Sequence, residues 1–109
     1  MDDNEIIIEE LVKFRDARDW EQFHNAKDLA LAISIEASEL NELFLWKSDE
    51  DADLSKIKEE LADVFAYSFL LANKYGFDIK EIVLEKIKKN AVKYPVDKAK
   101  GTAQKYNKL

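Results

Sequence analysis

Apolar residues recur along the chain at the spacing of an α-helix, and short polar stretches interrupt this recurrence three times. Only two Gly and one Pro occur among the 109 residues, too few for the many tight turns of a β-sandwich or barrel. The sequence therefore predicts an all-α fold. The predicted helices cover residues 5–18, 25–46, 54–75 and 78–93.

Residues that favour helix ends stand at several of the predicted boundaries. Asn25 and Asp78 are good N-caps for the second and fourth helices. Gly76 stands where the third helix should end, and Pro95 cannot continue the fourth. Residues 96–109 show no periodicity, so we expect them to form an extended or mobile arm.

The chain has the length and composition of one compact domain, with 47% hydrophobic and 37% charged residues. Its formal net charge of −6 is unevenly distributed, because residues 86–109 hold eight Lys against Asp97 alone. That end carries +7, which leaves −13 for residues 1–85. An acidic body of this kind argues against a nucleic-acid partner.

The absence of Cys excludes disulfides, thiolate metal sites and thiol nucleophiles, and it fits a reducing compartment. No apolar run approaches the roughly 18 residues that span a bilayer. The first five residues also lack the basic start of a signal peptide. We expect a cytoplasmic protein with no membrane partner.

The third predicted helix is apolar nearly all round, since residues 61–72 include only Asp63, Tyr67 and Ser68 as polar positions. Such a helix must be buried on almost every side. Three short helices of the same chain cannot easily cover it. The simplest remedy is a two-fold dimer whose bundle is completed by a second copy, and the alternative is a tightly wrapped monomer.

Two pairs of acidic residues stand where the second and third predicted helices would otherwise be apolar. Glu36 and Glu39 are three residues apart, as are Glu60 and Asp63. On a helix this spacing places both carboxylates of a pair on one face, with Cβ atoms roughly 5–6 Å apart. Glu36 interrupts the apolar stripe of the second helix, which consists of Leu29, Ile33, Leu40 and Leu43.

We expect these two helices to pack antiparallel, because the polar loop between them, residues 47–53, is short. The four carboxylates would then converge. Two charges 5 Å apart repel by roughly 3 kcal/mol at an effective dielectric constant of 20, so the cluster needs either solvent or a cation. Carboxylate oxygens suit a hard cation such as Mg²⁺ or Mn²⁺, and a chain with no Cys and one His does not favour zinc.

The acidic pairs have two other interpretations. In a chain with 23 acidic residues, Glu-x-x-Glu also arises by chance and usually marks a solvated helix face. Two pairs that each interrupt an apolar stripe on successive helices favour a site instead. A di-iron carboxylate bundle normally needs Glu-x-x-His on two helices, and the single histidine, His24, belongs to no such motif.

The acidic pairs also resemble the signature of a known family. Glu36-x-x-Glu39 followed by Glu60-x-x-Asp63 is similar to the pattern of the all-α nucleoside triphosphate pyrophosphohydrolases, the MazG-like superfamily. Three further stretches resemble the branch that includes the dCTP pyrophosphatases: Arg-Asp-Trp-Glu-Gln-Phe-His at 18–24, Leu-Phe-Leu-Trp-Lys at 43–47, and residues 86–95.

The resemblance covers roughly residues 5–96 and implies a four-helix MazG-like bundle completed by dimerisation. On this basis, residues 1–96 form the MazG-like domain and residues 97–109 a lysine-rich C-terminal tail. Ala26 departs from relatives that often have Pro there, and either residue suits a helix start.

The resemblance further implies hydrolysis of (deoxy)nucleoside triphosphates to monophosphate and pyrophosphate by a homodimer or homotetramer, with Mg²⁺ or Mn²⁺ as cofactor. House-cleaning of dCTP-like or non-standard nucleotides would be its role. The implied metal ligands are Glu36, Glu39, Glu60 and Asp63, with Glu39 and Glu36 as catalytic residues and Glu39 acting on the attacking water. The implied substrate-binding residues are Trp20, His24, Trp46, Lys47, Tyr67, Lys86, Asn90 and Lys93.

Two alternatives stay open at this point. The chain would be a non-catalytic helical interaction module if its acidic face docked a basic partner, although the apolar neighbours of Glu36 disfavour a solvated docking face. Within the same superfamily, the substrate would be another nucleotide, such as dUTP or phosphoribosyl-ATP. The resemblance around Trp20 and Trp46 favours a dCTP-like substrate.

Overall fold

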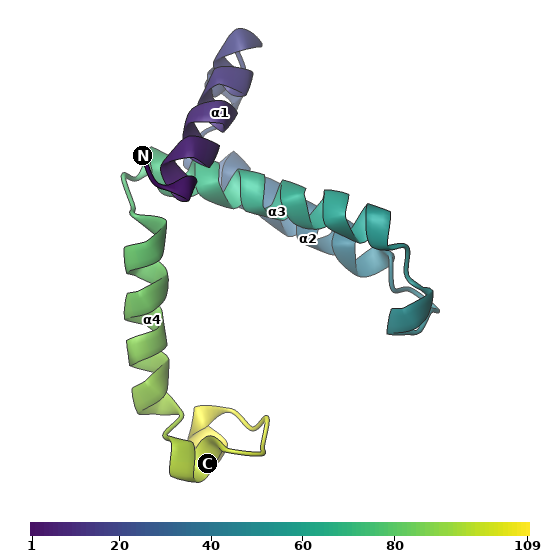
Figure 1. Cartoon of the computed structure of the whole chain (residues 1–109), viewed down its shortest axis with the longest axis vertical. Helices are drawn as coiled ribbons and strands as arrows, with labels where there is room; N and C mark the ends of the chain where they lie inside the picture. The colour runs from purple at the N-terminus through teal and green to yellow at the C-terminus, as the bar shows by residue number, and fades with distance from the viewer. The chain divides into compact units, whose positions relative to one another are not determined.

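The computed structural model describes all 109 residues and contains helices but no strand, which confirms the predicted all-α class (Figure 1). None of the helices combines the length and the apolar character that crossing a membrane requires. The elements, in chain order, are α1 (Asp3–Ala17), η1 (Glu21–Phe23), α2 (Ala26–Glu42), η2 (Asp49–Asp51), α3 (Leu54–Lys74), α4 (Ile79–Lys93), α5 (Val96–Ala99) and η3 (Tyr106–Lys108).

The chain divides into two compact units, residues 1–76 and 77–109. In the first unit, α2 and α3 lie side by side as the expected antiparallel hairpin, and α1 packs against α3 (Figure 1). Leu29 near the start of α2 and Leu70 near the end of α3 are buried, with 2% and 7% of their surfaces exposed. The antiparallel arrangement brings these two side chains to the end of the hairpin where α1 packs.

The predicted helix caps are confirmed. The Asn25 side chain accepts a hydrogen bond from the Asp28 amide at 2.8 Å, and the Asp78 side chain accepts one from the Glu81 amide at 2.9 Å. Each bond satisfies an amide that the first turn of a helix leaves unpaired. Gly76 follows α3 with φ +69°, the left-handed conformation that glycine adopts without steric cost.

The second helix is shorter than predicted, because α2 ends at Glu42 and not near Trp46. From Leu43 onward, backbone amides bond to carbonyls three residues back, as in the pair Phe44 to Asn41 at 3.1 Å. Over residues 43–47 the backbone therefore leaves the α-helix and forms tighter turns with hydrogen bonds between residues three apart. It passes through Trp46, which has φ +61° and is 93% exposed.

The second unit begins with α4 and ends in a folded tail, not in the extended arm that lack of periodicity suggested. Residues 96–99 form the short helix α5, and residues 106–108 form η3. The Tyr106 ring meets the Tyr94 ring edge-on at a centroid distance of 6.2 Å, and the Lys93 Nζ lies 5.0 Å from the Tyr106 centroid. A helix of one turn has no period to detect, which explains the difference.

The apolar composition of α3 demands burial on almost every side, but a single chain does not supply it. Leu61 is 40% and Phe65 is 55% exposed, whereas Leu70 and Ala72 are buried. Part of the apolar surface of α3 is thus covered within the chain, while Leu61 and Phe65 stay largely exposed. Completion of the bundle by a second copy stays a prediction.

Candidate active site

Three carboxylates meet between α2 and α3. Carboxylate oxygens of Glu36, Glu60 and Asp63 all lie within 4.8 Å of one another. Glu36 stands six residues before the end of α2, and Glu60 stands six residues after the start of α3. Equal distances from the connecting loop place the two side by side in an antiparallel hairpin, and the i, i+3 spacing adds Asp63 on the same face.

Two oxygens of this cluster are buried and lack a hydrogen-bond partner, namely Oε2 of Glu36 and Oε2 of Glu60. Burial raises the pKa of Glu36 to about 7, and the approach of the Glu39 carboxyl and the charges of Glu39, Asp63 and Glu60 add to the effect. Burial and the neighbouring Glu39 likewise raise the pKa of Glu60. The protein thus holds acidic groups where a negative charge is costly without a compensating positive one.

Glu39 stands beside the cluster of three and is exposed to solvent. Its oxygens do not join the set within 4.8 Å, yet its carboxyl is close enough to raise the pKa of both Glu36 and Glu60. The structure therefore brings together all four acidic residues that the sequence singled out. Three form the tight cluster, and the exposed Glu39 borders it.

The cluster fits a hard divalent cation. Its donors are carboxylate oxygens alone, the ligand type that Mg²⁺ and Mn²⁺ prefer. The unpartnered oxygens of Glu36 and Glu60 supply the specific observation, since buried polar atoms are almost always satisfied by some partner. A cation held among these carboxylates is the kind of partner that such oxygens lack.

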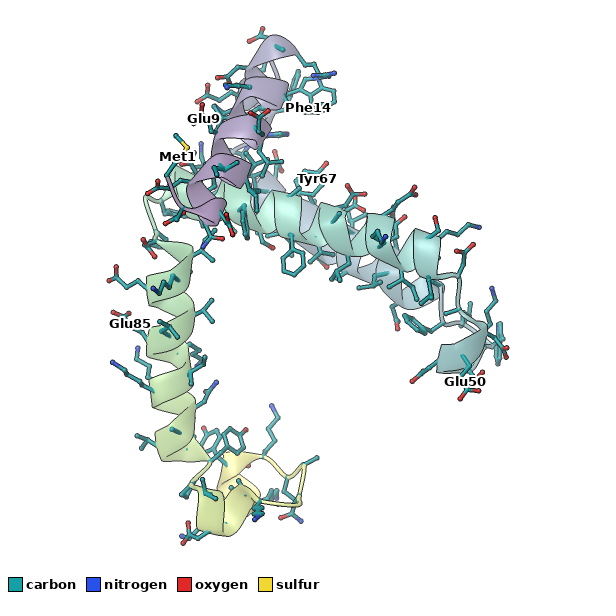
Figure 2. The ribbon with its side chains drawn as sticks, in the orientation of Figure 1. Met1, Glu9, Phe14, Glu50, Tyr67 and Glu85 are labelled. Atoms are coloured by element: carbon teal, nitrogen blue, oxygen red, sulfur yellow. The ribbon has the colours of Figure 1, made fainter.

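A cavity of about 280 Å³ adjoins the acidic cluster and shares Asp63 with it. Aromatic side chains form much of its wall. Phe14 of α1 and Tyr67 of α3 lie on the sides of their helices that face the angle between α1 and α3 (Figure 2). The complete lining consists of Leu11, Phe14, Arg15, Trp20, His24, Asp63, Ala66, Tyr67 and Leu70.

His24 stands at the centre of the aromatic wall. Its ring centroid lies 6.5 Å from that of Trp20 and 6.3 Å from that of Tyr67. Burial lowers the pKa of His24, and the positive charges of Arg15 and Lys74 lower it further. The ring is therefore neutral at pH 7, and its Nδ1 is buried without a hydrogen-bond partner.

Tyr67 links the aromatic wall to the acidic cluster, because it follows Asp63 by one helical turn. Burial raises the pKa of its hydroxyl, and the charges of Glu36, Asp63 and Glu39 raise it further. The phenol is therefore a hydrogen-bond donor at physiological pH. A ligand lying in the cavity would meet apolar rings, a neutral imidazole and a phenol, with carboxylates at one end.

A second cavity, of about 260 Å³, also adjoins His24. It shares Arg15, His24 and Leu70 with the first and is otherwise lined by Glu21, Leu29, Asn73 and Lys74. Sequence analysis missed Arg15, whose side chain is only 15% exposed and which lines both cavities. The sequence feature that could have identified Arg15 is its position one helical turn after Leu11, on the face of α1 that packs inward.

Five of the residues assigned to substrate binding are not brought to the cavity within the unit that holds it. The loop with Trp46 and Lys47 lies at the end of the α2–α3 hairpin away from α1 (Figure 1). Lys86, Asn90 and Lys93 are on α4, in the second unit. The roles proposed for these five residues stay predictions.

Comparison with known proteins gives the family. Residues 31–109 match the model of the MazG-like family. The chain belongs to the MazG-like family. The mouse dCTP pyrophosphatase 1 is 39% identical to this MazG-like chain over 105 residues, and the human dCTP pyrophosphatase 1 is 37% identical. The resemblance to the dCTP pyrophosphatase branch is thereby confirmed.

These alignments take in 89% of the MazG-like chain but 62% of each relative, so the chain spans less than two thirds of the curated proteins it matches. The match to a solved structure covers most of both chains. A crystal structure of a pyrophosphatase from Archaeoglobus fulgidus DSM 4304 superimposes with a TM-score of 0.78 at 37% identity, covering 84% of this chain and 91% of that one.

Proposed function

We propose that this chain is a divalent-metal-dependent pyrophosphohydrolase that converts a nucleoside triphosphate and water to the monophosphate and pyrophosphate. The observation that carries the proposal is the cluster of Glu36, Glu60 and Asp63 within 4.8 Å, with two buried unpartnered oxygens beside an aromatic cavity. The named activities of the mouse, human and archaeal relatives support it.

Each acidic residue has a role in the proposed reaction. Glu36, Glu60 and Asp63 would hold Mg²⁺ or Mn²⁺, with the neighbouring Glu39 as a further ligand. When bound, such a cation neutralises triphosphate charge and lowers the pKa of coordinated water. Glu39 would orient the attacking water and accept its proton, because it borders the cluster without being part of its tight core. Glu36 would take part in catalysis as the ligand that holds the cation beside this water.

The aromatic cavity would hold the nucleoside. Trp20 offers a flat apolar surface for a base, while His24 and Tyr67 offer polar atoms at its edge. We propose a dCTP-like or non-standard deoxynucleotide as substrate, on the strength of the dCTP pyrophosphatase relatives. Trp46 and Lys47, together with Lys86, Asn90 and Lys93, are proposed to bind the base and the phosphates in the assembled enzyme.

The proposal extends to assembly and location. The exposed Leu61 and Phe65 of α3 favour a homodimer or homotetramer that covers them. The absence of Cys favours the cytoplasm. The alternative of a non-catalytic docking module fits less well, because a docking face would not bury oxygens of Glu36 and Glu60 away from solvent.

A panel of deoxynucleoside triphosphates with Mg²⁺, assayed separately for pyrophosphate, monophosphate and orthophosphate, tests the proposal. Paired release of pyrophosphate and monophosphate is expected, and release of orthophosphate alone would indicate another phosphatase class. Glu36→Ala and Asp63→Ala should each abolish turnover without loss of helical circular dichroism. Glu59→Ala, beside Glu60 but exposed, is the matched control and should retain turnover. Near wild-type rates in the first two variants would refute the site.

A further inference from the structure

Helix α1 ends in a turn that places a non-glycine residue in the left-handed region. Asp19 has φ +54°, and the bonds around it are those of a Schellman motif. The Asp19 amide donates to the Asp16 carbonyl at 3.1 Å, and the Trp20 amide donates to the Arg15 carbonyl at 3.1 Å. Glycine normally occupies the Asp19 position of this motif, because a side chain there is sterically costly.

Gln22 holds this turn in place. Its side-chain Nε2 donates to the Asp19 carbonyl oxygen at 2.9 Å and to the Asp19 Oδ2 at 3.1 Å. The side-chain amide of Gln22 thus bonds to both the backbone and the side chain of Asp19. Gln22 itself is exposed, lies in η1 and lines neither of the cavities around His24.

The turn sets the direction of the residues that form the aromatic wall. Trp20 follows Asp19 directly, and its ring meets the Phe14 ring edge-on at a centroid distance of 5.7 Å. The Arg18 guanidinium covers the same Phe14 ring at 3.6 Å and donates to the Phe14 carbonyl at 3.0 Å. His24, two residues after Gln22, closes the wall. A change of φ at Asp19 would therefore alter the direction of the chain at Trp20, the residue that follows it.

We propose that Gln22 is a positioning residue: by clamping the left-handed Asp19 turn, it fixes Trp20 and His24 against the cavity beside the acidic cluster. The proposal rests on the proposed function for the identity of the ligand, a nucleoside triphosphate whose base lies against this wall. Gln22 acts through the turn and makes no contact with that ligand.

The test begins with Gln22→Ala in the full chain. Loss of the clamp should raise KM for the best deoxynucleotide about five- to tenfold while kcat stays within about twofold, because the acidic cluster is untouched. The NMR titration of His24, the single histidine, gives a readout without substrate. Its pKa should rise towards the model-peptide value of about 6.5 as the ring loses its burial.

A second variant separates clamping from other effects of the mutation. Glycine adopts φ +54° without strain. The double variant Asp19→Gly/Gln22→Ala should therefore have a KM and a His24 pKa closer to the wild-type values than Gln22→Ala alone. Gln22→Glu removes the donor at nearly constant size and should behave as Gln22→Ala does.

An unchanged His24 pKa in Gln22→Ala would overturn the proposal, whether or not KM rises, since a rise in KM alone would mean that Gln22 touches the substrate. A wild-type protein that hydrolyses no nucleotide would refute the proposed function and leave the His24 titration to decide the role of Gln22.

Discussion

The rings of His24 and Tyr67 lie 6.3 Å apart at an interplanar angle of 75°, an edge-to-face contact between the segment before α2 and the middle of α3. Tyr67 is one helical turn from Asp63, so this contact connects the aromatic wall to the acidic cluster. The position of the aromatic wall is therefore fixed relative to the position of the acidic cluster. A shift of α3 along α2 would disturb both together.

Mg²⁺ should stabilise the protein more at pH 7.5 than at pH 5, because protons compete with the cation for the carboxyls of Glu36 and Glu60 at the lower pH. Thermal unfolding at both pH values, with Mg²⁺ and then with EDTA, measures the difference. Ca²⁺ and Mn²⁺ serve as comparison ions. An equal effect of Mg²⁺ at the two pH values would argue against binding at this cluster.

Glu36→Gln should stabilise the metal-free protein at pH 7.5. The pKa of Glu36 is about 7 in the fold, against an ordinary value of 4.5 for a glutamate side chain. The folded state thus retains a proton that the unfolded state releases, and stability falls as the pH rises from about 4.5 to 7. A neutral amide removes this penalty, so we expect Tm to rise by about 4–8 °C at pH 7.5, the shift for roughly 1 kcal/mol, and little at pH 4.

The same variant should lose turnover and most of its response to Mg²⁺. Glu42→Gln, on the same helix and exposed, provides the control and should change neither Tm nor turnover. A Glu36→Gln protein that is less stable at pH 7.5 would contradict the electrostatic account of the cluster.

Trp20→Ala should weaken nucleotide binding with little effect on chemistry. Loss of a stacking surface for a base should raise KM about tenfold and leave kcat within about threefold. Steady-state kinetics with Mg²⁺ held constant measures both parameters. Phe23→Ala, three residues away and 62% exposed, is the control because Phe23 does not line the cavity. Comparable losses in both variants would point to a general effect on the segment.

Leu29→Ala should cost about 2–4 kcal/mol of unfolding free energy, because this side chain is 2% exposed at the end of the hairpin where α1 packs. Urea denaturation followed by circular dichroism measures the change. Leu31→Ala on the same helix, where the side chain is 54% exposed, should cost less than about 0.5 kcal/mol. Equal losses would show that the outer face of α2 is also covered in solution.

Local features of this chain were predictable from sequence. The spacing of Glu36 and Glu39, the caps at Asn25 and Asp78, and the shortness of the interhelical loop each depend on neighbouring residues alone. Together they predicted the antiparallel hairpin and the meeting of its carboxylates, both of which the structure contains.

Features that depend on packing between distant segments were missed. Arg15 lines both cavities only because α1 crosses α3, an angle that periodicity does not encode. The left-handed Asp19 was hidden because the sequence offers no glycine at that turn. The early end of α2 escaped detection since residues 43–46 are apolar and continue the helical pattern.

Since Glu36 and Glu60 stand well inside their helices, the segment that joins α2 to α3 contributes no oxygen to the cluster of three. Lengthening that segment by a few residues would leave the pairing of the two helices intact and cost little in chain entropy. The exposed residues 48–51, between Lys47 and the buried Ala52, are thus the place where this scaffold can accept a fluorescent label, an affinity tag or a graft from a homologue while its acidic centre keeps its form.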